Sequence, residues 1–196
     1  MGSLPERRPI IRGGLVYLRA PERSDISDFV RWLNDAEVLQ SLAMYAPMSE
    51  AAENAWFDRM LERQGSTDYH FVVCVLADGR AIGTAGLHAI DLVNGNAEFG
   101  IAIGETGEWD KGYGTDALRA VCDFGFGSLR LERIGLYVYE GNPRGRRAYE
   151  KAGFTLEGTL RHAHFARGRH EDVHVMSLLR DEWKPLAERR GADGDG

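Results

Sequence analysis

Apolar and polar positions alternate in several short stretches of the chain, a period of two that predicts β-strands. The alternation is clearest at 133–139, where aliphatic residues occupy every second position. A hairpin is expected where two apolar runs flank the turn Asp78-Gly79. The strands predicted between the N-terminus and residue 139 cover residues 15–19, 69–77, 82–87, 97–103 and 133–139.

A period near 3.6 predicts helices between the strands. Ser24 is expected to cap the first helix and Ser49 to start the second. A short later helix is expected to begin at Asn142, a good N-cap, and to stop at Gly153, which tolerates a left-handed conformation. The apolar stripes that define the first two helices are Ile26, Phe29, Val30 and Leu33, and then Trp56, Phe57 and Met60.

In chain order the predicted elements run β, α, α, β, β, β, α, β, α, β, β, without a repeat or a low-complexity linker. This order predicts one mixed α/β layer sandwich with a ligand at the central crossover. The expected domain covers residues 14–184. The ends, residues 1–13 and the acidic tail 185–196, are expected to be flexible, since the terminal GADGDG has no apolar content.

Composition is that of a soluble globular protein with one core, because 43% of the 196 residues are apolar and 28% are charged. The longest apolar run, Phe71–Ala77, is too short to span a bilayer, and the N-terminus lacks a signal-peptide pattern. We therefore expect a cytoplasmic protein that acts outside membranes. Cys74 and Cys122 lie among apolar residues without metal-ligand spacing, so both thiols are expected to be buried and reduced.

The formal net charge of -6 argues against nucleic acid as the main partner, because phosphate binding usually needs a basic face. The same charge permits a cationic substrate such as an amine, without identifying one. The histidines near the C-terminal end form no HExxH-type pair, and we expect no metal site.

One loop carries the clearest functional signal. Residues 108–120 (EWDKGYGTDALRA) follow a predicted strand and open a helix, with Gly112 and Gly114 in between. Glycines let a backbone approach a ligand closely, and a helix N-terminus offers unpaired N–H groups, so the loop predicts a phosphate cradle. The run is neither a P-loop nor a complete GxGxxG, since Asp116 and Ala117 follow Gly114 and Thr115. A tight turn without a ligand is the alternative.

Three segments follow one another along the chain: WDKGYGTDAL at 109–118, N-P-x-x-x-x-A-Y-x-K-x-G-F at 142–154, and D-x-x-x-M-S-L-L-x-x-E-W at 172–183. Together they resemble the GNAT superfamily of acyl-CoA-dependent N-acetyltransferases. The last segment is similar to the branch that contains ribosomal-protein N-terminal acetyltransferases and spermidine acetyltransferases. The resemblance implies a mixed, mostly antiparallel central sheet with flanking helices, in which the neighbouring parallel strands 97–103 and 133–139 splay apart.

The resemblance also implies acetyl-CoA as the cosubstrate, with its pyrophosphate on the backbone of the glycine loop and its pantetheine arm on the strand after Glu98. Asp110 departs from the family, which usually has glycine there, and its carboxylate is expected to face solvent because it would repel phosphates. Asn142 is explained nearly as well by a capping role alone. The implied cofactor-binding residues are Phe99, Gly100, Ile101, Trp109, Lys111, Gly112, Tyr113, Gly114, Thr115 and Asn142.

Amide formation from a thioester needs a neutral amine, stabilisation of the oxyanion and a proton for the thiolate, but no nucleophilic side chain. The chain has no G-x-S-x-G elbow, which is consistent with direct transfer. The resemblance implies Tyr149 as the acid that protonates the thiolate and Glu98 as the general base. His88 and water are the alternative bases, while a packed ring for Tyr149 and an exposed strand-end charge for Glu98 are the non-catalytic alternatives.

The acceptor is expected to contact the segments 34–50 and 164–172, with Asp35, Tyr45 and His88 as individual candidates. The expected acceptor is a primary amine: first a protein or peptide N-terminus, then a polyamine, then an amino-sugar or antibiotic amine. A homodimer is a further expectation. A non-catalytic acyl-CoA-binding sensor with the same fold is the alternative of a different class, and only turnover separates it from an enzyme.

Overall fold

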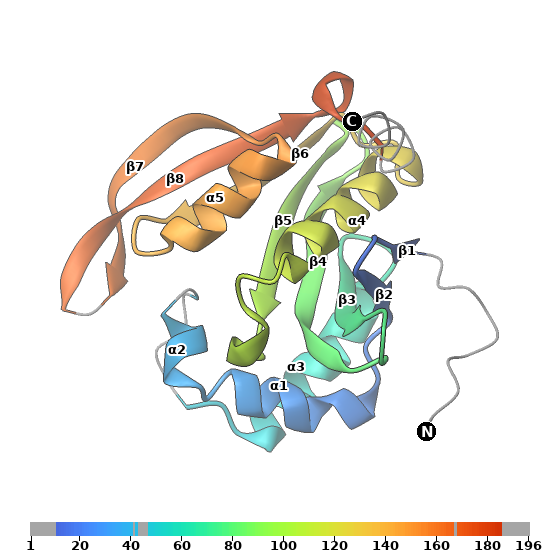
Figure 1. Ribbon diagram of the computed structural model, residues 1–196, viewed down its shortest axis with the longest axis vertical. Helices are drawn as coiled ribbons and strands as arrows, with labels where there is room; N and C mark the ends of the chain where they lie inside the picture. The colour runs from blue at the N-terminus through green and yellow to red at the C-terminus, as the bar shows by residue number, and fades with distance from the viewer. Residues whose placement is uncertain (1–10, 41, 43–46, 167, 186–196) are drawn as a thin grey trace.

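The computed structural model describes residues 11–40, 42, 47–166 and 168–185 (Figure 1). In this part of the chain, one sheet has the strand order β1-β2-β3-β4-β5-β6-β8-β7. All neighbouring strands are antiparallel except β5 and β6. The predicted mixed, mostly antiparallel sheet is thereby confirmed. The strands are β1 (Ile11–Arg12), β2 (Val16–Arg19), β3 (Tyr69–Val75), β4 (Ala81–Asp91), β5 (Asn96–Ile103), β6 (Arg133–Tyr139), β7 (Thr155–Ala166) and β8 (Arg169–Leu179).

The helices flank this sheet (Figure 1). Within the described residues, none of them combines the length and the hydropathy that a membrane crossing needs. The α-helices are α1 (Ile26–Trp32), α2 (Ala36–Leu39), α3 (Glu50–Arg63), α4 (Tyr113–Gly127) and α5 (Pro143–Ala152), and short 3-10 helices are η1 (Arg23–Asp25), η2 (Thr106–Glu108) and η3 (Arg180–Glu182).

The two faces of the sheet are covered by different helices, as alternating side chains of β3 show. Phe71 and Val73 belong to the core that contains residues of α4 and α5. Val72 and Cys74 pack instead with Phe29 of α1. Because β3 is buried on both faces, its sequence is a continuous apolar run rather than an alternating one. Cys74 and Cys122 are both buried and free, as expected.

Several predicted caps are confirmed. The Ser49 side chain accepts a hydrogen bond from the Ala52 N–H at the start of α3. Asn142 does the same for the Gly145 N–H at the start of α5, and α5 ends at Gly153 with a φ of 103°. The hairpin turn also lies where it was expected, with Gly79 at a φ of 75° between β3 and β4.

The start of the first helix differs from the prediction. Ser24 is not its cap, because a 3-10 turn at Arg23–Asp25 precedes α1. The Asp25 carboxylate accepts the Glu22 N–H at 2.8 Å and pairs with Arg19 at 2.7 Å, so Asp25 and not Ser24 fixes this turn. The sequence analysis also missed α2 and the two-residue strand β1, both too short to show a period.

β5 and β6 share only three parallel pairs before they separate. Asn96, Ala97 and Glu98 pair with residues 133–135, whereas β5 continues to Ile103 and β6 to Tyr139 without further pairing between them. The expected splay of the two parallel strands is confirmed, and it leaves the backbone of β5 beyond Glu98 unpaired on this side. Figure 1 shows α5 lying over the region where the strands diverge.

Candidate active site

The splay between β5 and β6 contains a cavity of about 390 Å³, which we call the splay cavity. Both predicted catalytic residues line it, Glu98 from β5 and Tyr149 from α5. The unpaired part of β5, represented by Gly100 and Ile101, forms another part of its wall. Residues from two elements about fifty positions apart in the sequence therefore meet where the sheet opens.

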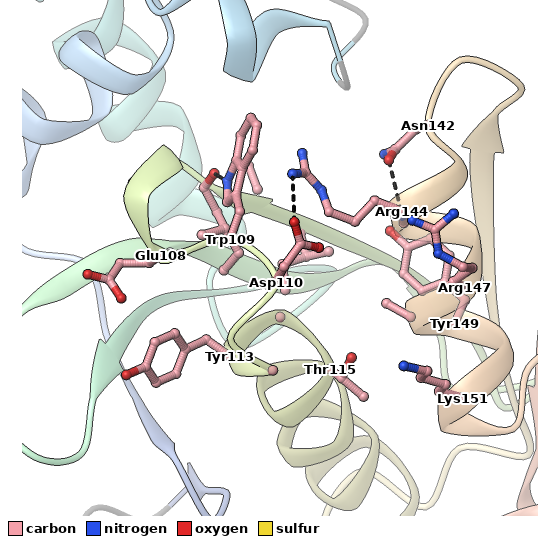
Figure 2. A pocket seen from close by; sticks show the side chains of 17 residues that line it. Glu108, Trp109, Asp110, Tyr113, Thr115, Asn142, Arg144, Arg147, Tyr149 and Lys151 are labelled. Atoms are coloured by element: carbon pink, nitrogen blue, oxygen red, sulfur yellow. Dashed lines mark hydrogen bonds and ion pairs between the residues drawn. The ribbon is translucent and has the colours of Figure 1, made fainter.

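A second cavity of about 240 Å³ lies between the glycine loop and α5 (Figure 2), and we call it the loop cavity. It shares Ile101, Asn142 and Tyr149 with the splay cavity, so the two adjoin. Together they form a path from the N-terminus of α4 to the Glu98 carboxylate. This shape suits an elongated ligand with phosphates at one end and a reacting group at the other.

The glycine loop leaves the first turn of α4 open to an anion. Gly112 is the N-cap residue, with a φ of 88°, and it supplies no side-chain cap for the N–H groups behind it. Those of Tyr113, Gly114 and Thr115 lie in the first turn, where helical backbones have unpaired donors. A β-carbon built on Gly114 would meet only Ile103, at 3.7 Å. The fold itself therefore does not require glycine at position 114, whereas a ligand close to the backbone would.

Trp109 anchors the loop to the end of β5. Its indole N–H donates to the Ile103 carbonyl at 2.8 Å, and the Arg144 guanidinium lies over its ring at 3.6 Å. Figure 2 shows the Arg144 guanidinium beside the Trp109 ring, with a dashed line to the Asp110 carboxylate. The tryptophan thus has a structural part in shaping the loop cavity besides the ligand contact predicted for it.

Asp110 explains why glycine is usual at its position. Its φ is 61°, in the left-handed region that glycine adopts freely and aspartate tolerates better than most residues. The side chain is 75% exposed, as expected, and lies 3.9 Å from Arg144. Asp110 therefore adopts a conformation that glycine would reach more easily, and it adds a carboxylate at the rim of the loop cavity.

Three cations of α5 line the loop cavity, and the sequence analysis did not single them out. Arg144, Arg147 and Lys151 lie three and four residues apart and so share one helix face (Figure 2). Lys111, the predicted phosphate neighbour, pairs with Glu108 at 3.1 Å and does not line the cavity. The spacing of basic residues in PRGRRAYEK is the signal that would have pointed to this face.

Tyr149 is a buried phenol with no protein hydrogen bond among the described residues. It is 8% exposed, and burial raises its pKa to about 12. Its ring packs edge-on against Phe99 at 6.3 Å between centroids. At neutral pH the hydroxyl is therefore protonated, and it is held by its ring at the junction of the two cavities.

The Glu98 carboxylate is solvent-accessible and has no hydrogen bond or ion pair with another described residue. Partial burial raises the pKa of its carboxyl, the direction that favours a general base at neutral pH. His88 lies directly opposite Glu98 in the β4–β5 ladder. The predicted strand 82–87 ends too early, because β4 continues past His88 through a bulge at Ala89, whose φ is 48°, to Asp91.

His88 also belongs to a cluster with Asp68 and His70 whose potential ligand atoms lie within 4.8 Å of one another. Burial lowers the pKa of both histidines, that of His70 to about 4, so both rings are neutral at pH 7. The Asp68 carboxylate already pairs with Arg63 at 2.9 Å and accepts the Ala89 N–H at 3.1 Å. These contacts give the Asp68 carboxylate a structural role, and the absence of a metal stays a prediction.

The remaining predicted residues have the following places. The Asp35 side chain caps α2 by accepting the N–H groups of Glu37 and Val38. Tyr45 lies outside the described residues. Phe99 is buried in the core, so only its backbone is open to a ligand in the splay cavity. Asn142 lines both cavities while its side-chain amide oxygen accepts the Gly145 N–H at 2.9 Å, so the cap leaves Asn142 at the wall of both cavities.

Comparison with known proteins identifies the family of this chain. Residues 16–155 match the acetyltransferase (GNAT) domain family. An uncharacterised N-acetyltransferase, p20, of Bacillus licheniformis is 32% identical over 85% of this chain and 93% of its own length. The spermidine N(1)-acetyltransferase of Vibrio cholerae is 30% identical over 87% of this chain and 96% of its own length. A putative ribosomal N-acetyltransferase of Bacillus subtilis is 36% identical over 56% of this chain and 60% of its own.

Among solved structures, the spermidine N-acetyltransferase of Vibrio cholerae in complex with CoA and spermine has a TM-score of 0.79 and 27% identity. The match covers 86% of this chain and 97% of that one. Both the family match and the relatives confirm the resemblance read from the three sequence segments. The chain belongs to the GNAT acetyltransferase family and is an acyl-CoA N-acetyltransferase.

Proposed function

We propose that this enzyme moves an acetyl group from acetyl-CoA directly to a primary amine in the splay cavity. The observation that carries the proposal is that Glu98 and Tyr149, a base and an acid by their chemistry, line one cavity that continues to the glycine loop. No nucleophilic side chain is required. The neighbouring cavities support a single site in which both substrates are present together.

The proposed coenzyme contacts follow from the same path. The open N–H groups of the first turn of α4 would hold the pyrophosphate, and Arg144, Arg147 and Lys151 would balance its charge. The unpaired backbone of β5 at Gly100 and Ile101 would hold the pantetheine arm in place of a neighbouring strand. The N–H donors and the cations fit the phosphates at one end of the ligand, and the strand edge fits an arm that contains amide groups.

In the proposed reaction the amine nitrogen attacks the thioester carbonyl, a C–N bond forms and the C–S bond breaks. Glu98 takes the proton that the amine loses, directly or through water. Tyr149 gives its proton to the departing thiolate and recovers one from solvent. Burial raises the pKa of the Glu98 carboxyl, which makes it a stronger base, and raises the pKa of Tyr149 to about 12, which keeps the hydroxyl protonated at neutral pH.

The proposal also specifies the class of amine that accepts the acetyl group. Relatives named as spermidine N(1)-acetyltransferases, which match over most of both chains, favour a polyamine. The relative named as a putative ribosomal N-acetyltransferase keeps a protein N-terminus as the second candidate, although the match covers little more than half of this chain. The polyamine thus moves ahead of the peptide N-terminus that the sequence analysis placed first.

Release of free thiol from acetyl-CoA, measured over a panel of polyamines, peptides and amino sugars, tests the proposed function. Stoichiometric formation of an acetylated amine is the expected result. If the protein binds the coenzyme but acetylates none of the acceptors, the non-catalytic sensor is favoured instead. Glu98→Gln distinguishes general-base catalysis from mere binding, because it keeps the shape of the side chain and removes its basicity.

The proposal includes a cytoplasmic homodimer. Two buried, free thiols suit a reducing compartment.

The homodimer is proposed from an edge of the sheet. β7 pairs only with β8 among the described strands and exposes Leu156, Leu160 and Phe165 along its length. An exposed apolar edge strand of this kind is commonly covered by a partner. Sedimentation of the purified chain at several concentrations, with and without coenzyme, tests this part of the proposal.

A further inference from the structure

A third cavity, of about 550 Å³, lies against the face of the sheet that α1 and α3 cover. We call it the aromatic cavity. Gly100 and Ile101 of β5, together with Leu42, line both the aromatic cavity and the splay cavity. The aromatic cavity and the splay cavity, which contains Glu98 and Tyr149, therefore adjoin along β5.

The walls of this cavity are mostly apolar and rich in aromatic rings. Phe29 and Trp32 contribute from α1 and Trp56 from α3. The Trp56 ring stands edge-on to Phe29 at 6.3 Å and to the His70 imidazole at 5.4 Å, so these rings form a continuous wall. Such walls suit methylene groups and, through the ring faces, an alkylammonium ion.

One ionisable group in the aromatic cavity has no counter-charge. Glu53, in the first turn of α3, is 3% exposed, and among the described residues no group forms a hydrogen bond or ion pair with its carboxylate. His70 and His88 also line the cavity, but burial lowers the pKa of both and leaves them neutral at pH 7. Arg59 is the remaining charged wall residue, and it is exposed to solvent.

A buried, unpaired carboxylate costs the fold stability, so its presence needs a reason. A helix first turn tolerates a negative charge, but the exposed positions of that turn offer the same benefit without burial. A cationic ligand would supply a counter-charge to the Glu53 carboxylate. The aromatic rings beside Glu53 strengthen this match, because their faces attract the same cation.

We propose that the aromatic cavity is the acceptor pocket and that Glu53 binds a second cationic group of the acceptor, which makes an aliphatic diamine the preferred substrate class. The inference rests on the acetyl transfer proposed above. One amine of the acceptor lies at Glu98 and Tyr149 and reacts, while the other stays charged against Glu53. The apolar walls between hold the methylene chain, and the one buried carboxylate selects for one distal cation.

Matched acceptors test this directly. Diaminopentane, with an amine at each end, is compared with pentylamine, which lacks the distal cation, and with aminopentanoate, which carries a negative group there. A series of diamines from three to six carbons finds the best length. For the best diamine we expect a kcat/KM at least tenfold above that of the monoamine of equal length, the gain of a charge-assisted contact. Aminopentanoate should be poorer than pentylamine.

Glu53→Gln keeps the shape of the side chain and removes its charge. Its preference for diamine over monoamine should fall to about two, the statistical factor for two equivalent amines, whereas Glu62→Gln, which removes an exposed charge from the same helix, should keep the wild-type preference. A ratio measured within each variant is independent of its active fraction. Equal use of diamine and monoamine by the wild type, or an unchanged ratio in Glu53→Gln, would overturn the inference.

Binding measured without acetyl transfer separates this inference from the proposed function. Diaminopentane should raise the melting temperature of the wild type and not that of Glu53→Gln. If the diamine stabilises only the wild type and no amine is acetylated, the acceptor pocket stands and the proposed reaction fails. If amines are acetylated but the diamine stabilises both proteins equally, the reaction stands and the role of Glu53 fails.

Discussion

Replacing Tyr149 with phenylalanine tests the proposed acid with little disturbance of the fold. The ring packs against Phe99 and Phe154, at 6.3 and 6.1 Å between centroids, and phenylalanine keeps both contacts. The hydroxyl has no protein partner among the described residues. Removing an unpaired, buried hydroxyl should leave the free energy of unfolding unchanged or raise it by up to about 1 kcal/mol. For a chain of this size, that is an increase in melting temperature of at most about 4 °C.

The expected loss in turnover follows from the pKa of the phenol. General acids typically contribute about 10²- to 10⁴-fold in rate. The Tyr149 pKa of about 12 lies well above the value of about 8.5 for an ordinary thiol, so complete proton transfer to the thiolate is uphill. The lower end of the range therefore applies. We expect kcat to fall about 10²-fold, which is about 2.7 kcal/mol in the activation barrier.

The assay is the rate of thiol release at saturating acetyl-CoA, with coenzyme affinity measured separately by thermal shift. Tyr137→Phe is the matched control, because Tyr137 lines the same cavity but is half-exposed and is assigned no role. Normal turnover in Tyr149→Phe would refute the acid assignment. Weak coenzyme binding with normal saturated turnover would make the hydroxyl a binding contact, and a lower melting temperature would reveal a structural hydrogen bond.

Four further outcomes follow. Glu98→Gln should lower kcat/KM about 10²-fold on the acid side of the pH profile, where the amine most needs a base, and a wild-type profile would exclude Glu98. Gly114→Val should fold normally yet lose the thermal shift caused by CoA, because its β-carbon has room in the protein but not beside a phosphate. Asp110→Gly should change the unfolding free energy by less than about 0.5 kcal/mol, because relief of the left-handed φ offsets the greater conformational entropy of the unfolded chain. The same substitution should tighten CoA binding, which calorimetry measures. Glu53→Gln should raise the melting temperature at pH 7, because burial raises the pKa of Glu53 and ionisation of the buried carboxyl lowers the stability of the wild type. In melting curves recorded over a pH series, the difference in melting temperature between the two proteins should vanish below about pH 4, where the carboxyl is protonated in both the folded and the unfolded state.

The sequence predicted the parts of this site that depend on local patterns. The glycine loop, the Asn142 cap and the Gly153 stop are signalled by residues within one or two turns of each other, and the structure has all three where they were expected. The splay of β5 and β6 came from the family resemblance instead. Strand alternation alone does not say where two parallel strands separate.

The missed features depend on contacts between distant parts of the chain. Asp116, in the first turn of α4, accepts the N–H groups of Gly14, Leu15 and Val16, about a hundred residues away, and so ties the start of β2 to α4. Glu53 read from sequence is an ordinary charge in a helix first turn. Only the tertiary fold buries it, and no local period carries that information.

Initial rates with acetyl-CoA and a diamine varied together test the central claim most directly. The adjoining splay, loop and aromatic cavities predict that both substrates bind before any product leaves, with one free thiol released for each acetylated amine. Intersecting lines in the double-reciprocal plot, with no acetylated enzyme on the pathway, are the predicted result. A ping-pong pattern, or an isolable acetylated enzyme that passes its acetyl group to the amine, would contradict the account.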